Sequence, residues 1–183
     1  MKKLIIAFTL FLPFAGMANN LQIQPTYSVE TTHRQFPEPA KRITRTYLGL
    51  AATYGTHALS TEFEVAQSTY SENTEGIDTT STIRRAMLGL RSYPLTSKYL
   101  GGYVRGGISA RQEVLDINDN GDKREEKLPV YLDPYAGAGL TLAVANNIAI
   151  NAGATMIYNR GAESSDKYDV QYTLSGTFRV GNR

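Results

Sequence analysis

The most constraining feature of this chain is an alternation of apolar and polar residues that recurs along most of its length. It is clearest near the C-terminus, where every second residue belongs to one mostly apolar series: Tyr168, Val170, Tyr172, Leu174, Gly176, Phe178 and Val180. The interleaved positions are mostly polar, from Asp169 to Arg179. A period of two places successive side chains on opposite faces of a β-strand, so this segment predicts a strand with one apolar and one polar face.

Seven earlier segments repeat the pattern, which gives eight expected strands in all. Their apolar faces fall within residues 21–29, 48–54, 59–65, 86–90, 100–108, 130–142 and 148–158. Pro25 and Pro134 lie inside two of these segments and indicate an edge or a bulge, because proline cannot donate to a strand ladder. The chain has no cysteine, which excludes disulfides, thiol catalysis and a lipid-modified N-terminal cysteine.

Residues 1–18 have the pattern of a cleaved secretory signal. Lys2 and Lys3 precede an apolar run over residues 4–14, and small residues follow at 15–18. The apolar run is too short for a spanning helix, which needs about 20 residues. We therefore expect one mature domain over residues 19–183. It keeps 17 of the 19 basic residues and all 17 acidic ones, so its net charge is zero and it offers no basic patch for nucleic acid.

The alternation fits a transmembrane barrel with its apolar face outside, or a soluble lipocalin-type barrel with the same faces reversed. The polar face favours the transmembrane orientation, because it mixes charged residues with small residues and tyrosines, as in a narrow lumen filled by side chains. Its charged residues are Arg45, Glu62, Glu64, Arg85, Arg91, Arg105, Arg111, Asp133, Asp169 and Arg179. Its tyrosines are Tyr47, Tyr103, Tyr131 and Tyr135. Glu62 and Glu64 are expected to pair with arginines of the next two strands, because isolated charge in a lumen is costly.

The connections between the expected strands alternate in length. Four are long and charged, at residues 28–42, 70–80, 112–128 and 160–167. Three are short, at residues 54–57, 92–98 and 143–147. Outer-membrane barrels have short periplasmic turns and longer outer loops, so both termini are expected on the periplasmic side. Aromatic girdles are expected at both interfaces, with Tyr54 and Phe178 at the periplasmic rim and Tyr158 and Tyr168 at the outer rim.

On these features the chain resembles the small bacterial outer-membrane β-barrel family, of the OmpX and OmpA transmembrane-domain type. The resemblance implies an all-β fold, an eight-stranded antiparallel up-and-down transmembrane β-barrel in the Gram-negative outer membrane. It also implies contact with outer-membrane lipid and lipopolysaccharide. The alternating strand over residues 168–178 looks like the family's assembly signal, which the barrel-assembly machinery reads. The chain departs from that signal after Phe178, because residues 179–183 follow the aromatic residue.

Enzymes exist on this scaffold, and family lipid deacylases and palmitoyl transferases use a histidine base and a serine nucleophile. This chain has 2 histidines. His33 is interpreted as a solvated residue of the first outer loop, and His57 as part of a periplasmic turn, on the wrong side for outer-leaflet lipid. Glu62 and Glu64 are more simply partners of lumen arginines than a catalytic pair. We therefore assign no catalytic, cofactor-binding or metal-binding residue and expect no enzyme.

Residues 116–122 resemble the opening of a calcium-binding loop, with oxygen ligands at alternate positions and a glycine for the turn. The residues concerned are Asp116, Asn118, Asn120, Gly121 and Asp122. The closing bidentate glutamate should stand at position 127, where the chain has Lys127. A plain hydrophilic outer turn is the preferred interpretation, with calcium as the weaker alternative.

The sequence thus predicts a structural or surface-interaction barrel whose outer loops meet the environment. Eight strands enclose a space only wide enough for side chains, so no wide diffusion pore is expected. Any small conductance should change when Arg85 or Arg105 is replaced. Two alternatives stay open at this point: a soluble periplasmic barrel that holds an apolar ligand, and a lipid-modifying enzyme of the outer membrane.

Overall fold

The computed structural model describes residues 20–34, 41–56, 58–74, 77–119, 122–159 and 167–180, and most of them lie in strands. The strands are β1 (Asn20–Arg34), β2 (Lys41–Gly55), β3 (Ser60–Thr74), β4 (Ile77–Thr96), β5 (Leu100–Asp119), β6 (Asp122–Lys127), β7 (Tyr131–Ala145), β8 (Ile148–Tyr158) and β9 (Tyr168–Val180). The expected signal, residues 1–18, lies outside the described residues. Within those residues there is no helix long and apolar enough to cross a membrane.

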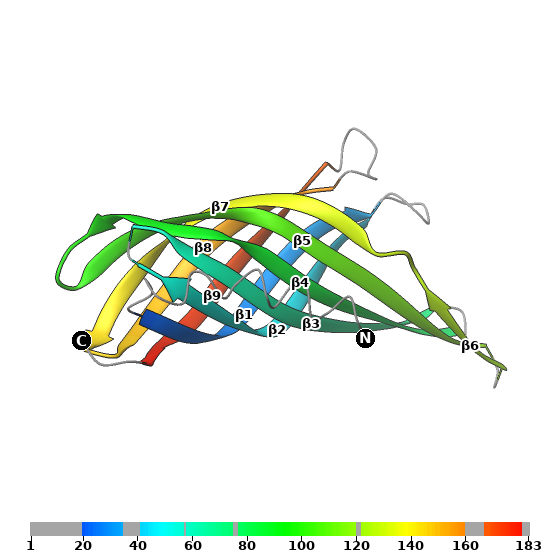
Figure 1. Cartoon of the computed structure of the whole chain (residues 1–183). Helices are drawn as coiled ribbons and strands as arrows, with labels where there is room; N and C mark the ends of the chain where they lie inside the picture. Colours follow the sequence, from blue (N-terminus) through cyan, green and yellow to red (C-terminus); the bar gives the residue numbers. More distant parts are fainter. Residues whose placement is uncertain are drawn as a thin grey trace, which may run out of the picture.

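The strands form a closed antiparallel barrel (Figure 1). Neighbours in the sheet follow the order β4-β3-β2-β1-β9-β8-β7-β5, and the pairing of β4 with β5 joins the two ends. The remaining strand, β6, pairs with the last part of β5 and stands outside this closed circle. The wall therefore has eight strands in up-and-down order, as predicted. Closure satisfies the backbone amides of the wall, which would otherwise be costly in hydrocarbon.

The two ends of the barrel differ in their connections. Three tight connections, at residues 56–59, 97–99 and 146–147, lie at one end, which we call the turn end. β1 begins at this end and β9 ends there. Leu21, near the start of β1, pairs with Tyr54 near the end of β2 and with Val180, the last residue of β9. The other four connections of the eight-stranded wall, one of which contains β6, lie at the opposite end, which we call the loop end.

The predicted length of three loop-end connections, at residues 28–42, 70–80 and 112–128, was wrong, because strands continue far into them. Within residues 112–128, expected as a loop, residues 112–119 belong to β5 and residues 122–127 form β6. Hydrophilic residues can still pair as strands outside a membrane, where their side chains bond across the ladder. The Ser71 and Thr80 hydroxyls bond at 3.0 Å, and the Asn73 amide donates to Asp78 at 2.6 Å.

Strands β4 and β5 are the longest, with 20 residues each. A tilted strand needs only about 9–11 residues to cross a bilayer, so both strands reach well beyond the wall. Their ends, together with those of β3 and β6, form a projecting sheet at the right of Figure 1. We call it the outer ribbon and define it as residues 69–74, 77–82, 113–119 and 122–127.

The two prolines that were predicted as weak points lie where a ladder is interrupted. Pro25 pairs with Leu50 of β2, whereas the register of β1 with β9 has no partners at Gln24 and Pro25. Pro134 pairs with Ile108 of β5, one residue before the ladder between β7 and β8 begins. Each proline thus pairs with a residue of one neighbouring strand and has no partner on the other, as expected for a residue without a backbone N–H.

Candidate functional site

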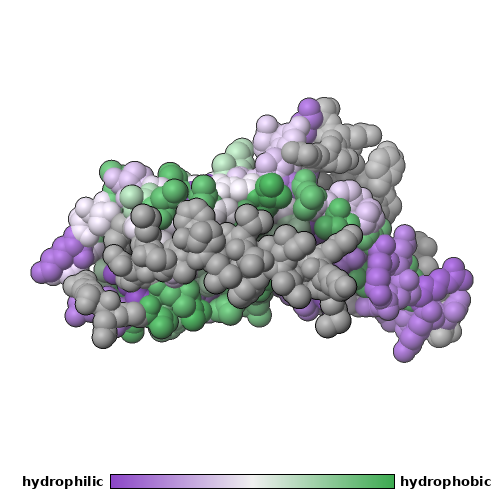
Figure 2. Space-filling model, viewed as in Figure 1, coloured by the Kyte–Doolittle hydropathy of each residue, from purple (hydrophilic) through white to green (hydrophobic). Residues whose placement is uncertain are grey.

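The outward face of the wall is an apolar belt. Leu88, Val104, Ile150 and Leu174 are 46%, 48%, 46% and 54% exposed, and further large apolar side chains surround them. Figure 2 shows hydrophobic surface across the middle of the barrel and hydrophilic surface at both ends. A soluble lipocalin-type barrel would have these side chains in its centre, so that alternative is wrong.

Aromatic residues lie near both ends of the belt, as predicted. Tyr54 pairs with Leu21 at the turn end, and Phe178 pairs with Ile23 and Ile148 close by. Tyr158 and Tyr168 pair at the loop end, with ring centroids 5.3 Å apart. This placement agrees with aromatic girdles at the two membrane interfaces.

The inward face contains the polar residues that the alternation predicted. Glu62, Glu64, Arg85, Arg91 and Arg105 are all less than one-tenth exposed. Tyr47, Tyr103 and Tyr135 are buried beside them. Tyr131 is an exception to the prediction and is 44% exposed, because it starts β7 at the loop end, opposite Arg111. The lumen is therefore filled by charged, amide, hydroxyl and phenol groups.

Four buried charges from three adjacent strands form a cluster that we call the inner quartet: Glu62, Glu64, Arg91 and Arg105. A nitrogen of Arg91 lies 2.5 Å from Glu62, on the neighbouring strand. One Arg105 nitrogen lies 2.8 Å from Glu62 and 3.1 Å from Glu64, two strands away. The predicted pairing of these glutamates with arginines of β4 and β5 is confirmed, and the quartet is neutral.

Further contacts of the two quartet arginines extend the cluster across the lumen. Arg91 donates to the Gln24 amide oxygen of β1 at 3.1 Å, and Arg105 donates to the Thr155 hydroxyl of β8 at 3.1 Å. The guanidinium groups also lie over aromatic rings, Arg91 4.4 Å from the centre of Tyr103 and Arg105 5.3 Å from that of Tyr135. Such stacking stabilises a buried cation without adding a second charge. The quartet thus braces strands on opposite sides of the barrel.

A second set of buried charges lies closer to the loop end, and we call it the outer cluster: Glu30, Arg85, Arg111, Asp133 and Asp169. Arg85 donates to Glu30 at 2.5 Å across the lumen. Arg111 lies 3.3 Å from Asp169 and 4.0 Å from both Glu30 and Asp133. These contacts connect β1, β4, β5, β7 and β9.

Neutral side chains complete the outer cluster. Asn159 accepts from Arg111 at 3.2 Å and donates to Asp169 at 2.7 Å, and Tyr47 donates to Glu30 at 3.3 Å. The centre of the Tyr47 ring lies 4.3 Å from the Arg85 guanidinium carbon. Glu30 and Asp169 therefore each contact more than one donor, which is how buried charge becomes tolerable.

A third contact ties the outer ribbon to the wall. Arg45 of β2 donates to the Ser81 hydroxyl at 3.0 Å and to Glu113 at 3.3 Å, and Ser81 also donates to Glu113. Glu113 belongs to the ribbon part of β5, and its side chain is 18% exposed. The base of the ribbon is thus fixed by charge as well as by strand pairing.

The arrangement suits a structural interior better than a reaction centre. The carboxylates of both clusters face guanidinium groups rather than a free space for substrate. Among the described residues no group of three acidic or histidine side chains is placed to hold a metal ion. The geometry therefore favours a brace between strands.

The residues considered for catalysis and calcium lie elsewhere. His33 stands opposite Arg42 in the backbone register of β1 and β2, and His57 is outside the described residues, so neither imidazole is placed here. Asp116 and Asn118 lie in β5, opposite Glu125 and Lys123 of β6. Alternate residues of an extended strand share a face but lie about 6.6 Å apart along the strand, which does not match a loop whose oxygens converge on one ion. The calcium alternative is therefore not supported by the described part of this hairpin.

Two carboxylates of the lumen network were missed by sequence reasoning. Glu30 and Glu113 fell inside segments interpreted as loops, at residues 28–42 and 112–128. The signal that could have found them is the alternation of inward and outward positions along each strand. Glu30 continues the inward series of Gln22, Gln24, Thr26 and Ser28 on β1.

Comparison with known proteins gives structural matches without sequence matches. No protein family model matches the chain, and no curated protein is a significant match. Neisserial surface protein A aligns with TM-score 0.66 at 12% identity, covering 88% of this chain and 97% of its own. Ail, the attachment invasion locus protein of Yersinia pestis, solved with the heparin analogue sucrose octasulfate, aligns with TM-score 0.63 at 14% identity, covering 90% and 99%.

OprG of Pseudomonas aeruginosa aligns with TM-score 0.59 at 13% identity, covering 91% of this chain and 98% of its own. At such identities the likeness concerns the fold. Each match spans nearly the whole partner chain, so the agreement covers a complete barrel rather than a shared hairpin. The fold of this chain is therefore that of the small eight-stranded outer-membrane β-barrels, the family that its sequence resembles.

Proposed function

We propose that this protein is an outer-membrane β-barrel with a structural or surface-interaction role, in which a braced wall presents the outer ribbon to the cell's surroundings. The observation that carries the proposal is the distribution of charge. Ion pairs fill the lumen, apolar side chains cover the outside, and hydrophilic strands project from one end. Such a molecule is stable only where hydrocarbon surrounds the belt and water surrounds the ribbon.

A rigid support for the ribbon favours a binding role over a transport role. β4 and β5 run without a break in their pairing from Ile77 opposite Asp119 to Ser92 opposite Val104. The Arg45 contact to Glu113 holds the base of the ribbon, and the inner quartet blocks the lumen below it with paired side chains. The ribbon is therefore an ordered platform rather than a flexible loop. The blocked lumen argues against a role in solute passage.

The charge of the ribbon argues against a polyanion as partner. Ail was solved with a sulfated ligand, and the same ligand class would need a basic surface here. β6 reads DKREEK, with equal numbers of basic and acidic residues, and the ribbon part of β5 adds Asp116 and Asp119. Over its whole defined extent the outer ribbon has eight acidic and three basic residues, so the partner that this surface favours is one with a basic surface, such as another protein.

The lumen carboxylates give no support to a lipid-modifying enzyme. In a triad the carboxylate accepts a hydrogen bond from the histidine base, whereas the carboxylates of the lumen are engaged with arginines. We therefore propose a protein without enzymatic activity. Deletion of the gene should leave lipopolysaccharide acylation unchanged, and a change that a His33→Ala variant abolishes would contradict this.

Insertion is proposed to depend on β9 as the assembly signal. Phe178 points outward at the turn end and is 48% exposed, which leaves its ring open to the barrel-assembly machinery. Phe178→Ala should reduce the inserted fraction in vivo, whereas Thr177→Ser, on the inward face of the same strand, should not. Equal insertion of both variants would contradict this role for β9.

The test of the proposed function combines closure, location and accessibility. The folded protein should migrate differently in detergent gels before and after boiling, and it should stay with outer membranes in carbonate. Trypsin added to whole cells should cut the outer ribbon at Lys123 or Arg124, while Arg91 and Arg105 stay protected in the lumen. Release with the periplasmic fraction, or a ribbon that resists trypsin on intact cells, would overturn the proposal.

A further inference from the structure

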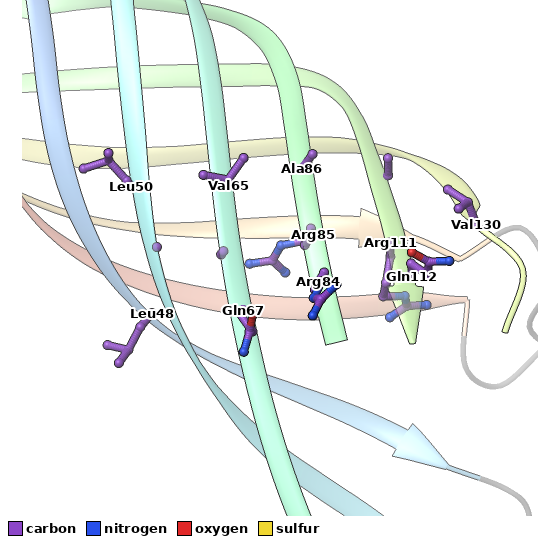
Figure 3. Close-up of a pocket in the computed structure, with 13 residues that line it drawn as sticks. Leu48, Leu50, Val65, Gln67, Arg84, Arg85, Ala86, Arg111, Gln112 and Val130 are labelled. Atoms are coloured by element: carbon purple, nitrogen blue, oxygen red, sulfur yellow. The ribbon is translucent and has the colours of Figure 1, made fainter. Parts of the chain in front are cut away.

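One cation on the outward face of the wall has no role in the lumen network. Arg84 of β4 is exposed on the outside, directly after the apolar belt in the direction of the loop end. Cross-strand register places Gln67 of β3 on one side of it and Gln112 of β5 on the other. Figure 3 shows the three polar side chains on neighbouring strands, with Arg84 in the middle.

The row of outward residues next to these polar side chains has small side chains in its middle. Continuing toward the turn end, the register aligns Leu50, Val65, Ala86, Ala110 and Leu132 across five neighbouring strands. The two alanines are small and stand between larger side chains. They form the floor of a groove of about 660 Å³ on the outside of the wall, which Arg84, Gln67 and Gln112 border at the loop end (Figure 3).

The charge around Arg84 is uncompensated on the outward face. In the described parts of β3, β4 and β5, the outward positions from Arg84 through the belt contain no other charged residue. On these strands the nearest outward acids are Asp78, six residues before Arg84 on β4, and Asp116, four residues beyond Gln112 on β5. No ion pair joins Arg84 to a described carboxylate. A guanidinium at a membrane interface gains most from a phosphate group, because it can donate two parallel hydrogen bonds to two of the phosphate oxygens.

We propose that Arg84, Gln67 and Gln112 bind a phosphate of lipid A, the membrane anchor of lipopolysaccharide, while one of its acyl chains lies in the groove over Ala86 and Ala110. The inference rests on the outer-membrane location proposed above. The cation and its amide neighbours match the anionic headgroup, and the alanine floor matches a hydrocarbon chain that enters the belt from the same point. The position at the loop end selects the outer leaflet, where lipid A is the phosphate-bearing lipid.

The experiment measures binding of diphosphoryl lipid A to the purified full-length mature protein in detergent, by native mass spectrometry. Gel mobility before and after boiling first establishes that each variant is a closed barrel. The charge variant is Arg84→Gln, and the groove variant is Ala86→Leu with Ala110→Leu. The matched control is Lys127→Gln, because Lys127 is an exposed cation on the ribbon that already contacts Glu125 at 2.9 Å.

Arg84→Gln should weaken binding of lipid A roughly tenfold, as expected for loss of charge-assisted hydrogen bonds. Lipid A without its phosphates should bind the wild type and Arg84→Gln equally. The groove variant should also bind diphosphoryl lipid A less tightly, whereas Lys127→Gln should stay within about twofold of the wild type, since exposed charges contribute little.

Equal affinity of wild type and Arg84→Gln would overturn the proposal, and so would an unchanged affinity of the groove variant. An equal loss in Lys127→Gln would also overturn it, because the charge effect would then be non-specific. These results leave the proposed function intact as long as the wild type is a closed barrel. A wild type without heat-modifiable mobility would instead contradict the proposed function itself.

Discussion

The same chemical pair, arginine with a carboxylate, occurs in two very different places in this molecule. In the inner quartet the side chains of Arg105 and Glu62 are 3% and 0% exposed, with 2.8 Å between nitrogen and oxygen. In the outer ribbon the side chains of Arg124 and Asp122 are 78% and 68% exposed, at 3.1 Å. The two nitrogen–oxygen distances are therefore nearly equal, although one pair is buried in the lumen and the other is exposed to solvent.

The difference in burial determines what each pair contributes. A buried charge has lost its water, so each member of the inner quartet depends on the others, and removal of one leaves an uncompensated ion. An exposed pair exchanges its partner for water at little cost. The quartet is thus expected to be essential for the folded barrel, whereas the ribbon pair is a feature of the surface. Substitutions along this gradient test the comparison.

The largest effect is expected from Arg105→Met. Arg105 is the residue that binds Glu64 in the quartet, so its loss leaves that carboxylate buried without its counter-ion. The free energy of unfolding should fall by about 3–5 kcal/mol. The measurement is urea unfolding of the protein refolded into phosphatidylcholine vesicles, followed by circular dichroism.

A second substitution distinguishes lost charge balance from lost volume. Arg105→Met combined with Glu64→Leu removes both members of one pair and keeps the contact of Arg91 with Glu62. Buried ion pairs replaced by apolar residues are often neutral in stability, so the double variant should recover most of the loss. A double variant as unstable as the single one would show that packing, not charge, explains the effect.

The next effect is expected on the outside of the same wall. Leu88 lies in the middle of the belt, opposite Phe63 and Ile108. Leu88→Arg should lower the free energy of unfolding by about 2–4 kcal/mol in vesicles, because the charge would sit in hydrocarbon. Thr69→Arg, on the outward face of the ribbon part of β3, is the control and should cost about 0–1 kcal/mol. Equal costs would mean that lipid does not surround the belt.

A smaller effect is expected where tyrosines pack against glycines in the lumen. A Cβ at Gly139 would lie 2.5 Å from the Tyr103 ring and from the Ala152 carbonyl oxygen. Gly139→Ala should therefore cost about 1–3 kcal/mol of unfolding free energy, the range for an overpacked core. Gly176→Ala is the control, since the nearest atom to its Cβ would be 3.9 Å away. If the two substitutions cost the same in vesicle unfolding, the tight fit at Tyr103 is not significant.

The inner quartet could be predicted from the sequence because its members lie on consecutive strands. Parity places Glu62 and Glu64 on one face of β3, and antiparallel pairing brings the inward arginines of β4 and β5 beside them. No knowledge of the closed barrel is needed for that step. The belt follows from the same parity, once the charged face is recognised as the interior.

The outer cluster could not be predicted in this way. Arg85 and Glu30, as well as Arg111 and Asp169, meet across the lumen from strands far apart in sequence. Their proximity depends on barrel closure and on the stagger of the strands, which no local pattern encodes. The extent of β5 and the existence of β6 were missed for another reason. Hydrophilic residues outside the membrane lose the apolar half of the alternation, although their backbones still pair.

The smallest effect is expected in the outer ribbon. Arg124→Ala removes a cation that contacts Asp122 at 3.1 Å in an exposed hairpin. The free energy of unfolding should change by about 0–1 kcal/mol, because water replaces the lost contact. The change should also shrink at 1 M salt, where the Debye length is about 3 Å, whereas the cost of Arg105→Met should persist. If removal of Arg124 destabilised the protein as much as removal of Arg105, burial would not be what separates the two regions, and the ribbon would have to be regarded as part of the folded core.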